Sequence, residues 1–202
     1  MPDQIAEVLT IGHSNHDTPT FLGLLRAASV TAIADVRSIP FSRRNPQFDR
    51  ERLAADLRAE GVAYVHLGSQ LGGRPADPLL WRDGIADFER IAATPSFREG
   101  LDRVLAGARI HRLALMCGER DPLHCHRCLL VGRALVGRGA RVDHLLADGG
   151  RRSQTEIEAE LLALAGFGDG QGDLLSTPEE RLALAYRDQV RRLHRGGITR
   201  RI

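Results

Sequence analysis

The stretch HRLALMCGERDPLHCHRC, residues 111–128, decides the fold. It opens with a largely apolar run, His111–Cys117, that predicts a buried strand. After a polar loop at 118–120, Asp121 followed by Pro122 predicts the start of a helix, because Asp is a good cap and Pro fits the first turn. A buried strand that leads through a polar loop into a helix is the repeating unit of α/β proteins.

The same alternation extends outward along the chain in both directions. Four further strands are predicted at Val8–Gly12, Thr31–Val36, Ala63–Gly68 and Arg141–Asp148. Helices are predicted between them at 17–28, 49–61, 88–93 and 96–107. Strands that alternate with helices imply crossover connections. We therefore expect an α/β fold with a mostly parallel five-stranded sheet and helices on both faces.

The C-terminal quarter of the chain has a different pattern. Two amphipathic segments, Thr155–Ala165 and Pro178–His194, predict helices with a glycine-rich loop between them and no strand. We therefore expect residues 1–150 to form the α/β domain. Residues 151–202 are expected to form a helical extension packed on the same domain.

Composition and charge restrict the class of protein. The 202 residues carry 28 basic and 26 acidic side chains, and every basic one is arginine. A net charge of +2 argues against a strongly basic nucleic-acid binder, although the guanidinium fork suits phosphate and carboxylate groups. Three cysteines cannot form a disulfide framework, and neither a signal peptide nor a long apolar segment is evident. We expect a cytoplasmic protein without a membrane partner.

Polar residues follow most of the predicted strands at the point where each strand ends. His13 and Ser14 follow the first strand, and Cys117 and Glu119 follow the fourth. In open parallel sheets the ligand crevice lies beyond the carboxyl ends of the strands, so these side chains are expected to meet there. The long loop 36–49 adds arginines and prolines that suit an anionic group.

Four ordered motifs resemble the domain of unknown function 488 family. They are TIGHS (10–14), DVRSIPFSRRNPQF (35–48), LGG (71–73) and MCGERDPLHCHR (116–127), within a resemblance that spans roughly Val8 to Gly149. The resemblance implies an α/β domain with a shared polar site, and it implies no particular activity. The positions it carries over are Gly12, His13, Ser14, Asp35, Arg37, Pro40, Ser42, Phe48, Gly72, Gly73, Cys117, Glu119, Cys125, His126 and Arg127.

The three cysteines admit several interpretations. Cys128 is expected to pack in the core on an apolar helical stripe, whereas Cys125 is expected near the strand ends, close to Cys117. A zinc site from the three cysteines with His124 or His126 is conceivable, but the paired C-x₂-C spacing of strong zinc motifs is missing. On a helix, Cys125 and His126 would also point about 100° apart. We therefore predict no metal ligands, and no cofactor is indicated.

A redox pair formed by Cys125 and Cys128 is a further alternative. The C-x-x-C spacing after a strand suits it, but the aromatic and Gly-Pro surroundings of thioredoxin-like enzymes are missing. A thiol site for an anionic substrate is favoured instead, because a helix N-terminus attracts anions.

The leading hypothesis is an enzyme acting on a phosphate-bearing ligand, a nucleotide or a nucleic-acid end. The predicted catalytic residues are His13, Cys117, Glu119 and Cys125. The predicted substrate-binding residues are Ser14, Asp35, Arg37, Ser42, Arg43, Arg44, Gly72, Gly73, His126 and Arg127. The alternatives are a non-catalytic module that binds nucleic acid or a partner, and a Cys/His metal-binding protein.

Overall fold

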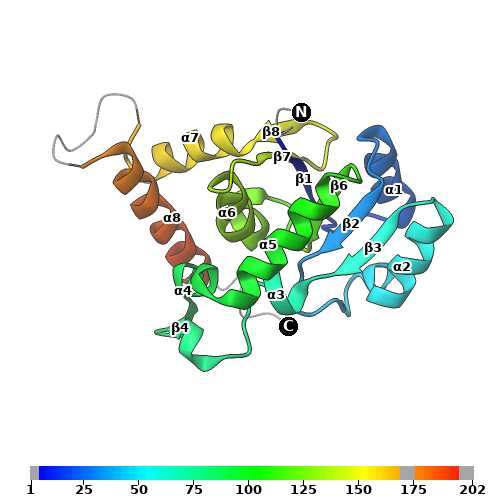
Figure 1. Cartoon of the computed structure of the whole chain (residues 1–202), viewed down its shortest axis with the longest axis horizontal. Coiled ribbons are helices and arrows are strands. Elements are labelled where there is room, and N and C mark those ends of the chain that lie inside the picture. The colour runs from blue at the N-terminus through cyan, green and yellow to red at the C-terminus, as the bar shows by residue number, and fades with distance from the viewer. Residues whose placement is uncertain (1–4, 169–175, 196–202) are drawn as a thin grey trace.

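The computed structural model describes residues 5–168 and 176–195 of the chain, which form an α/β fold around one central sheet (Figure 1). The strand order across the sheet is β3-β2-β6-β1-β7-β8. Five strands run parallel, and β8 pairs antiparallel with β7. The strands span Glu7–Gly12 (β1), Ala32–Asp35 (β2), Ala63–His66 (β3), Leu113–Cys117 (β6), Arg141–Leu145 (β7) and Arg151–Ser153 (β8). The predicted fold class is confirmed, with six strands in place of five.

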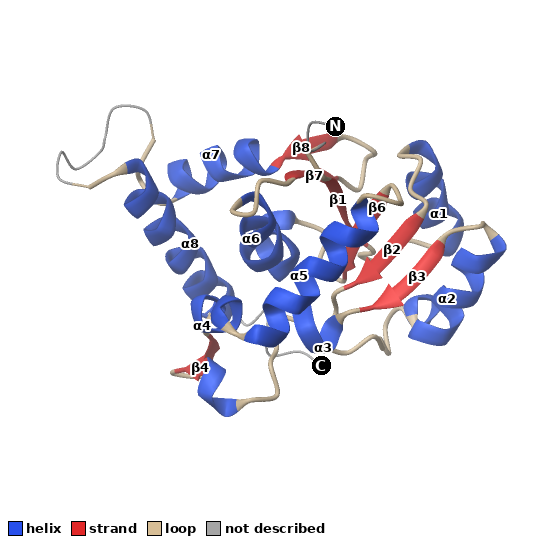
Figure 2. Ribbon diagram, in the orientation of Figure 1, coloured by secondary structure: helices blue, strands red, loops and turns tan. Residues whose placement is uncertain are grey.

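Helices cover both faces of the sheet (Figure 2). On one face lie α1 (Thr18–Ala27) and α2 (Arg50–Ala59); on the other lie α3 (Gly68–Leu71), α4 (Phe88–Ala93), α5 (Pro95–Ala108) and α6 (Arg133–Val136). The alternation of side chains along β1 explains the two layers, because Val8 packs toward α5 while Leu9 and Ile11 pack toward α1.

The segment after β6 departs from the predicted helix. Asp121 caps only a short 3₁₀ turn, Pro122–His124, by accepting a hydrogen bond from the Leu123 amide. Cys125 is then extended, with φ −136° and ψ 139°. Helical structure resumes at Arg127–Gly132 as a π-helix and continues into α6. The prediction of one continuous helix from Pro122 was therefore wrong, because Cys125 interrupts it.

Two helices, α7 (Gln154–Leu164) and α8 (Pro178–Arg195), pack against the π-helix through a separate apolar cluster that includes Cys128. A buried hydrogen-bond chain ties them to the sheet. The Thr10 hydroxyl donates to Nδ1 of His144 at 2.7 Å, and Nε2 of His144 donates to Gln154 Oε1 at 2.8 Å. The amide of Gln154 then donates to the hydroxyl of Tyr186 on α8 at 2.7 Å. The parts of this extension at 169–175 and 196–202 lie outside the described residues.

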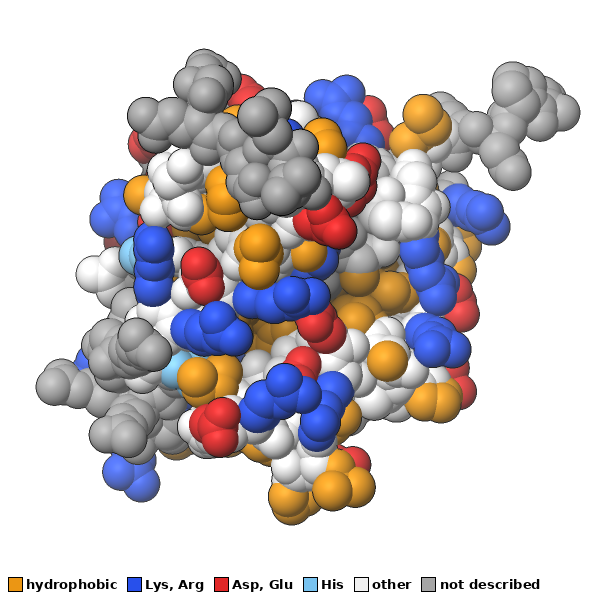
Figure 3. All heavy atoms as spheres, turned by 90° about the vertical axis from the view of Figure 1, so that its left-hand side faces the viewer, with side chains coloured by type: hydrophobic (Ala, Val, Ile, Leu, Met, Phe, Trp, Pro, Cys, Tyr) orange, Lys and Arg blue, Asp and Glu red, His pale blue; other side chains and the backbone are white. Residues whose placement is uncertain are grey.

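Three short strands were not predicted. β8 begins the segment that was expected to be purely helical, and β4 (Trp81–Arg82) pairs with β5 (Ile85–Ala86) in a small hairpin before α4. On the outer surface of α7 and α8, arginine side chains lie interspersed with carboxylate side chains (Figure 3). No helix among the described residues is long and apolar enough to cross a membrane.

Candidate active site

A pocket of about 570 Å³ opens at the carboxyl ends of β1, β2 and β6. These ends meet there because the three strands are parallel neighbours in the sheet. The lining residues come from the loops after the strands, from the segment around Cys125 and from the end of α8. They are His13, Ser14, Asn15, Arg37, Ser38, Ile39, Phe41, Ser42, Arg44, Asn45, Gly73, Arg74, Phe88, Cys117, Gly118, Glu119, Arg120, His124, Cys125, His126, Leu193 and His194.

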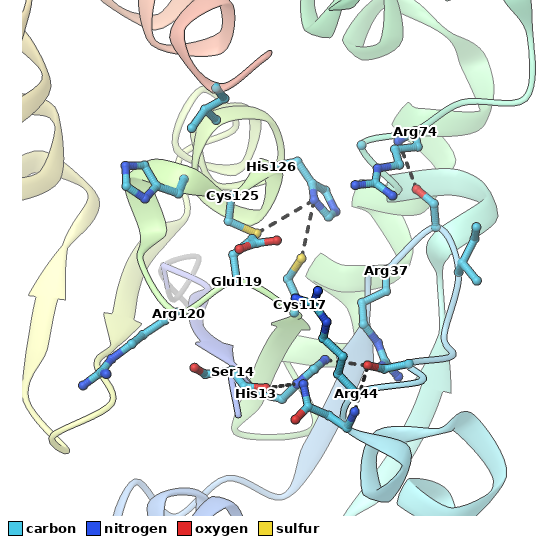
Figure 4. A pocket seen from close by; sticks show the side chains of 18 of the residues that line it. His13, Ser14, Arg37, Arg44, Arg74, Cys117, Glu119, Arg120, Cys125 and His126 are labelled. Atoms are coloured by element: carbon cyan, nitrogen blue, oxygen red, sulfur yellow. Dashed lines mark hydrogen bonds between the residues drawn. The ribbon is translucent and has the colours of Figure 1, made fainter. Parts of the chain in front are cut away.

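Two thiols and one imidazole point toward one another inside this pocket (Figure 4). Nδ1 of His126 lies 3.5 Å from Sγ of Cys117 and 3.9 Å from Sγ of Cys125. The 3₁₀ turn and the extended residue Cys125 replace the continuous helix that the sequence predicts. The expected angle of about 100° between Cys125 and His126 assumed that helix and does not apply here; the Cys125 sulfur and Nδ1 of His126 lie 3.9 Å apart.

The orientation of the His126 ring is fixed from two sides. Its Nε2 donates a hydrogen bond to the carbonyl oxygen of Val36 at 2.9 Å, so Nδ1 of the neutral ring has a free lone pair facing the sulfurs. Gly73 lies directly against the ring, and a Cβ at that position would be 2.7 Å from Cβ and Cγ of His126. Glycine is therefore required there to make room for the imidazole.

The two thiols differ in acidity. A hydrogen bond from Cys125 lowers the pKa of Cys117, and burial works against that effect. Burial and the neighbouring Cys117 sulfur raise the pKa of the Cys125 thiol. Burial disfavours a proton on His126, but the Cys125 sulfur outweighs it and raises the pKa of the ring. Cys117 is therefore the better thiolate of the pair.

A buried ion pair supports the wall formed by β2. The guanidinium of Arg37 donates to Asp35, with Nη2 to Oδ2 at 2.6 Å, and both side chains are buried. Nη1 of Arg37 also lies 3.4 Å from Nε2 of His13. Burial, together with the charge of Arg37, lowers the pKa of His13 to about 4, so this ring is neutral at physiological pH.

Phe48 anchors the long loop after β2. Its fully buried ring stacks on His13 with the centroids 4.3 Å apart. The Ser42 hydroxyl stabilises the same loop by accepting a hydrogen bond from the Asn45 amide at 3.1 Å.

Arg127 stabilises the loop after β6 through hydrogen bonds to its backbone carbonyls. Its side chain is 0% exposed, and its guanidinium donates from Nη1 to the carbonyl of Glu119 and from Nη2 to the carbonyl of Arg120 at 2.9 Å. The end of β1 lies against the same carbonyl, where a Cβ on Gly12 would clash with Glu119. Arg127 therefore positions the loop that carries Glu119 and does not line the pocket.

The exposed arginines of the pocket are Arg44 and Arg120, and neither forms an ion pair with a carboxylate of the described residues. Arg74 joins them from the loop after α3, and its amide donates to the Ser38 hydroxyl at 3.0 Å. Arg43 is exposed but lies outside the lining. Among the lining residues, Glu119 is the one carboxylate.

The structure brings together ten of the fourteen predicted site residues. Those that line the pocket are His13, Ser14, Arg37, Ser42, Arg44, Gly73, Cys117, Glu119, Cys125 and His126. Those that do not line it are Asp35, Arg43, Gly72 and Arg127. The prediction missed Leu193 and His194, because the docking of α8 leaves no sequence signal. It also left out Arg74 and Arg120, although both lie in loops that the strand-end argument had marked.

Comparisons with known proteins identify the family of the chain but indicate no activity. A family model described as "Domain of unknown function DUF488" matches residues 17–134, which is more than half of the chain. Neither the curated proteins nor the solved structures contain a significant match. The matched range includes the loop after β2 and the whole segment from Cys117 to Arg127, while His13 lies before it.

Proposed function

The chain belongs to the DUF488 family, and we propose that it is an intracellular enzyme acting on a phosphate-bearing ligand, a nucleotide or a nucleic-acid end. The observation that carries the proposal is that Arg44 and Arg120, which form no ion pair with a carboxylate of the described residues, line the pocket that also contains the cluster of Cys117, Cys125 and His126. A site that combines cationic forks with reactive side chains is suited to binding an anion and to changing it chemically.

The charge balance of the pocket supports an anionic ligand. Arg37 is neutralised by Asp35, but Arg44 and Arg120 have no ion-pair partner among the described carboxylates, and Glu119 is the one acidic side chain in the lining. Guanidinium groups bind phosphate through paired hydrogen bonds, each stronger than a neutral one. We infer that the phosphate binds between the loop after β2 and the loop after β6.

The loop after β2 also offers a stacking surface. Phe41 lines the pocket and is 56% exposed, so its ring is accessible to a ligand. A nucleobase stacked on an aromatic ring gains about 1–3 kcal/mol. Phe41 therefore favours a nucleotide or a nucleic-acid end over a simple phosphate ester.

The reaction is assigned to the cluster and to Glu119. Cys117, Cys125 and His126 supply the reacting group, and Glu119 is the acid or base nearest in sequence to Cys117. His13, at the end of β1, is the second candidate for proton transfer. Hydrolysis or group transfer at the bound phosphate ester are the reaction classes that this set of side chains suits.

The first experiment measures ligand binding. Calorimetry with nucleoside monophosphates, the matching nucleosides and inorganic phosphate separates the contribution of the phosphate from that of the base. Loss of a charged hydrogen bond costs about 1.5–3 kcal/mol, so Arg44→Gln and Arg120→Gln should weaken binding of the monophosphates about 10- to 100-fold. Arg43→Gln is the matched control, because that arginine is exposed on the same loop but lies outside the pocket.

The second experiment separates catalysis from binding. A panel of nucleotides and of 5′- and 3′-phosphorylated oligonucleotides is incubated with the protein and analysed by mass spectrometry. Glu119→Gln should abolish turnover while leaving binding in place. Binding that weakens steeply with salt and is followed by no chemical change would instead indicate a non-catalytic nucleic-acid binder.

A further inference from the structure

The cluster of Cys117, Cys125 and His126 has the dimensions of a metal site. Its two sulfurs and the Nδ1 atom of His126 all lie within 4.8 Å of one another. In tetrahedral zinc sites, Zn–S bonds of about 2.3 Å and Zn–N bonds of about 2.0–2.1 Å place sulfur and nitrogen about 3.6 Å apart. The separations here, 3.5 and 3.9 Å, bracket that value.

The surroundings of the ligand atoms match those of a metal centre. A ligating imidazole usually donates its other N–H to a carbonyl or carboxylate, and Nε2 of His126 donates to the Val36 carbonyl at 2.9 Å. The amide of Arg127 donates to Sγ of Cys125 at 3.4 Å, which is a hydrogen bond that favours a thiolate at that position. Two of the three donors, His126 and Cys125, are therefore held in place by hydrogen bonds with the protein itself.

We propose that Cys117, Cys125 and His126 bind a zinc ion whose fourth position opens to the pocket. Two thiolates and one imidazole form a ligand set that suits zinc, and three protein ligands leave one coordination position for water or substrate. Glu119 lies outside the group of mutually close donors, so it remains free to act as an acid or base. Only this use of the open position rests on the proposed function; metal binding itself does not.

The other candidates for zinc ligands in this segment are excluded by their positions. Cys128 faces the apolar cluster under α7 and α8, where its sulfur lies 3.6 Å from Gln154 Oε1. His124 is exposed and lies beside Asp121 at 3.8 Å. The site thus consists of three ligands, and Cys128 provides a matched control for substitution.

Elemental analysis of the full chain tests the proposal. The protein is purified under reducing conditions without a metal-binding tag, and the ratio of zinc to protein is measured by plasma mass spectrometry. We expect one zinc per chain in the native protein and in Cys128→Ser. Cys117→Ser, Cys125→Ser and His126→Ala should each lose it, with circular dichroism confirming that the variants are folded.

Cobalt substitution provides a test that needs no variant. Co²⁺ added to metal-free native protein should give the intense visible bands of tetrahedral cobalt and a thiolate-to-metal band in the near ultraviolet. Absence of zinc together with failure to bind Co²⁺ would overturn the proposal. Retention of zinc in the three variants, or a disulfide between Cys117 and Cys125 in the reduced preparation, would overturn it as well.

The readouts separate this proposal from the proposed function. Metal content and cobalt spectra do not depend on the substrate, whereas the arginine variants change ligand binding without touching the three ligands. Zinc binding without any interaction with phosphate esters would refute the proposed function alone. Binding and turnover of a nucleotide by a native protein that contains no zinc and fails to bind Co²⁺ would refute the zinc site alone.

Discussion

Replacement of Arg127 by methionine should loosen the loop that carries Glu119. The guanidinium of Arg127 satisfies two carbonyl groups, those of Glu119 and Arg120, and its backbone amide contacts the Cys125 sulfur. Methionine fills a similar volume and keeps the backbone amide, but it offers no donor. The substitution therefore removes the link between the loop after β6 and the π-helix.

The size of the effect follows from two opposing contributions. Two hydrogen bonds from a charged donor contribute about 1.5–3 kcal/mol each, so their loss destabilises by about 3–6 kcal/mol. Removal of a fully buried cation recovers part of this, because its desolvation was unfavourable and Nε of Arg127 has no partner among the described residues. The side chains of Glu119 and Arg120 are exposed, so their carbonyls can turn toward water. We expect a net loss of about 2 kcal/mol, or about 4–8 °C in Tm.

Urea unfolding and hydrogen exchange measure this prediction. Arg127→Met should unfold at lower urea, and amides at 118–120 should lose protection while those of α1 keep theirs. Arg127→Lys retains the charge but cannot bond both carbonyls at once, so it should fall between the native protein and the methionine variant. Arg43→Met, on an exposed arginine, is the control. Unchanged stability and loop protection in Arg127→Met would refute the reasoning.

Three further predictions concern groups away from the loop. Burial lowers the pKa of His144 to about 4, so its neutral form stabilises the fold fully above pH 6.5. This contribution to the free energy of unfolding, about 3 kcal/mol, should be lost as the pH falls toward 4. In His144→Gln, the free energy of unfolding measured in urea should therefore change less between pH 6.5 and 4 than it does in the native protein. Gly73→Ala should displace His126 and weaken Co²⁺ binding about tenfold, whereas Gly23→Ala, in open space on α1, should leave it unchanged. Tyr186→Phe should destabilise the protein by about 1–2 kcal/mol in urea, because a buried amide loses its acceptor.

The sequence predicts the main sheet because apolar residues mark its parallel strands, although these strands are only four to six residues long. All five predicted strands exist, and because they run parallel, the polar loops that follow them meet at one edge of the sheet. The strands that were missed, β4, β5 and β8, are two or three residues long. Segments that short show no periodicity, and only pairing with a neighbour makes them strands.

The sequence indicates where in the fold the pocket lies, but not how the side chains inside it are arranged. The strand-end argument brings Cys117, Glu119 and His13 to one pocket, since it depends only on strand direction. The relation between Cys125 and His126 depends instead on the backbone at a single residue, and no local signal distinguishes an interrupted helix from a continuous one. The orientation of the Arg127 side chain likewise depends on which carbonyl groups surround it after folding. No local sequence pattern around Arg127 shows which carbonyl groups these are.

The interruption at Cys125 gives the two cysteines of the C-x-x-C segment opposite environments. Cys125 belongs to the core on the α5 side of the sheet and reaches the pocket, whereas Cys128 belongs to the cluster under α7 and α8. In one regular helix, residues three apart would share a face. The extended residue therefore separates a cysteine of the pocket from a cysteine of the core. His126, one residue later, lies with Nδ1 3.5 Å from the Cys117 sulfur at the end of β6, where its ring is held by the Val36 carbonyl.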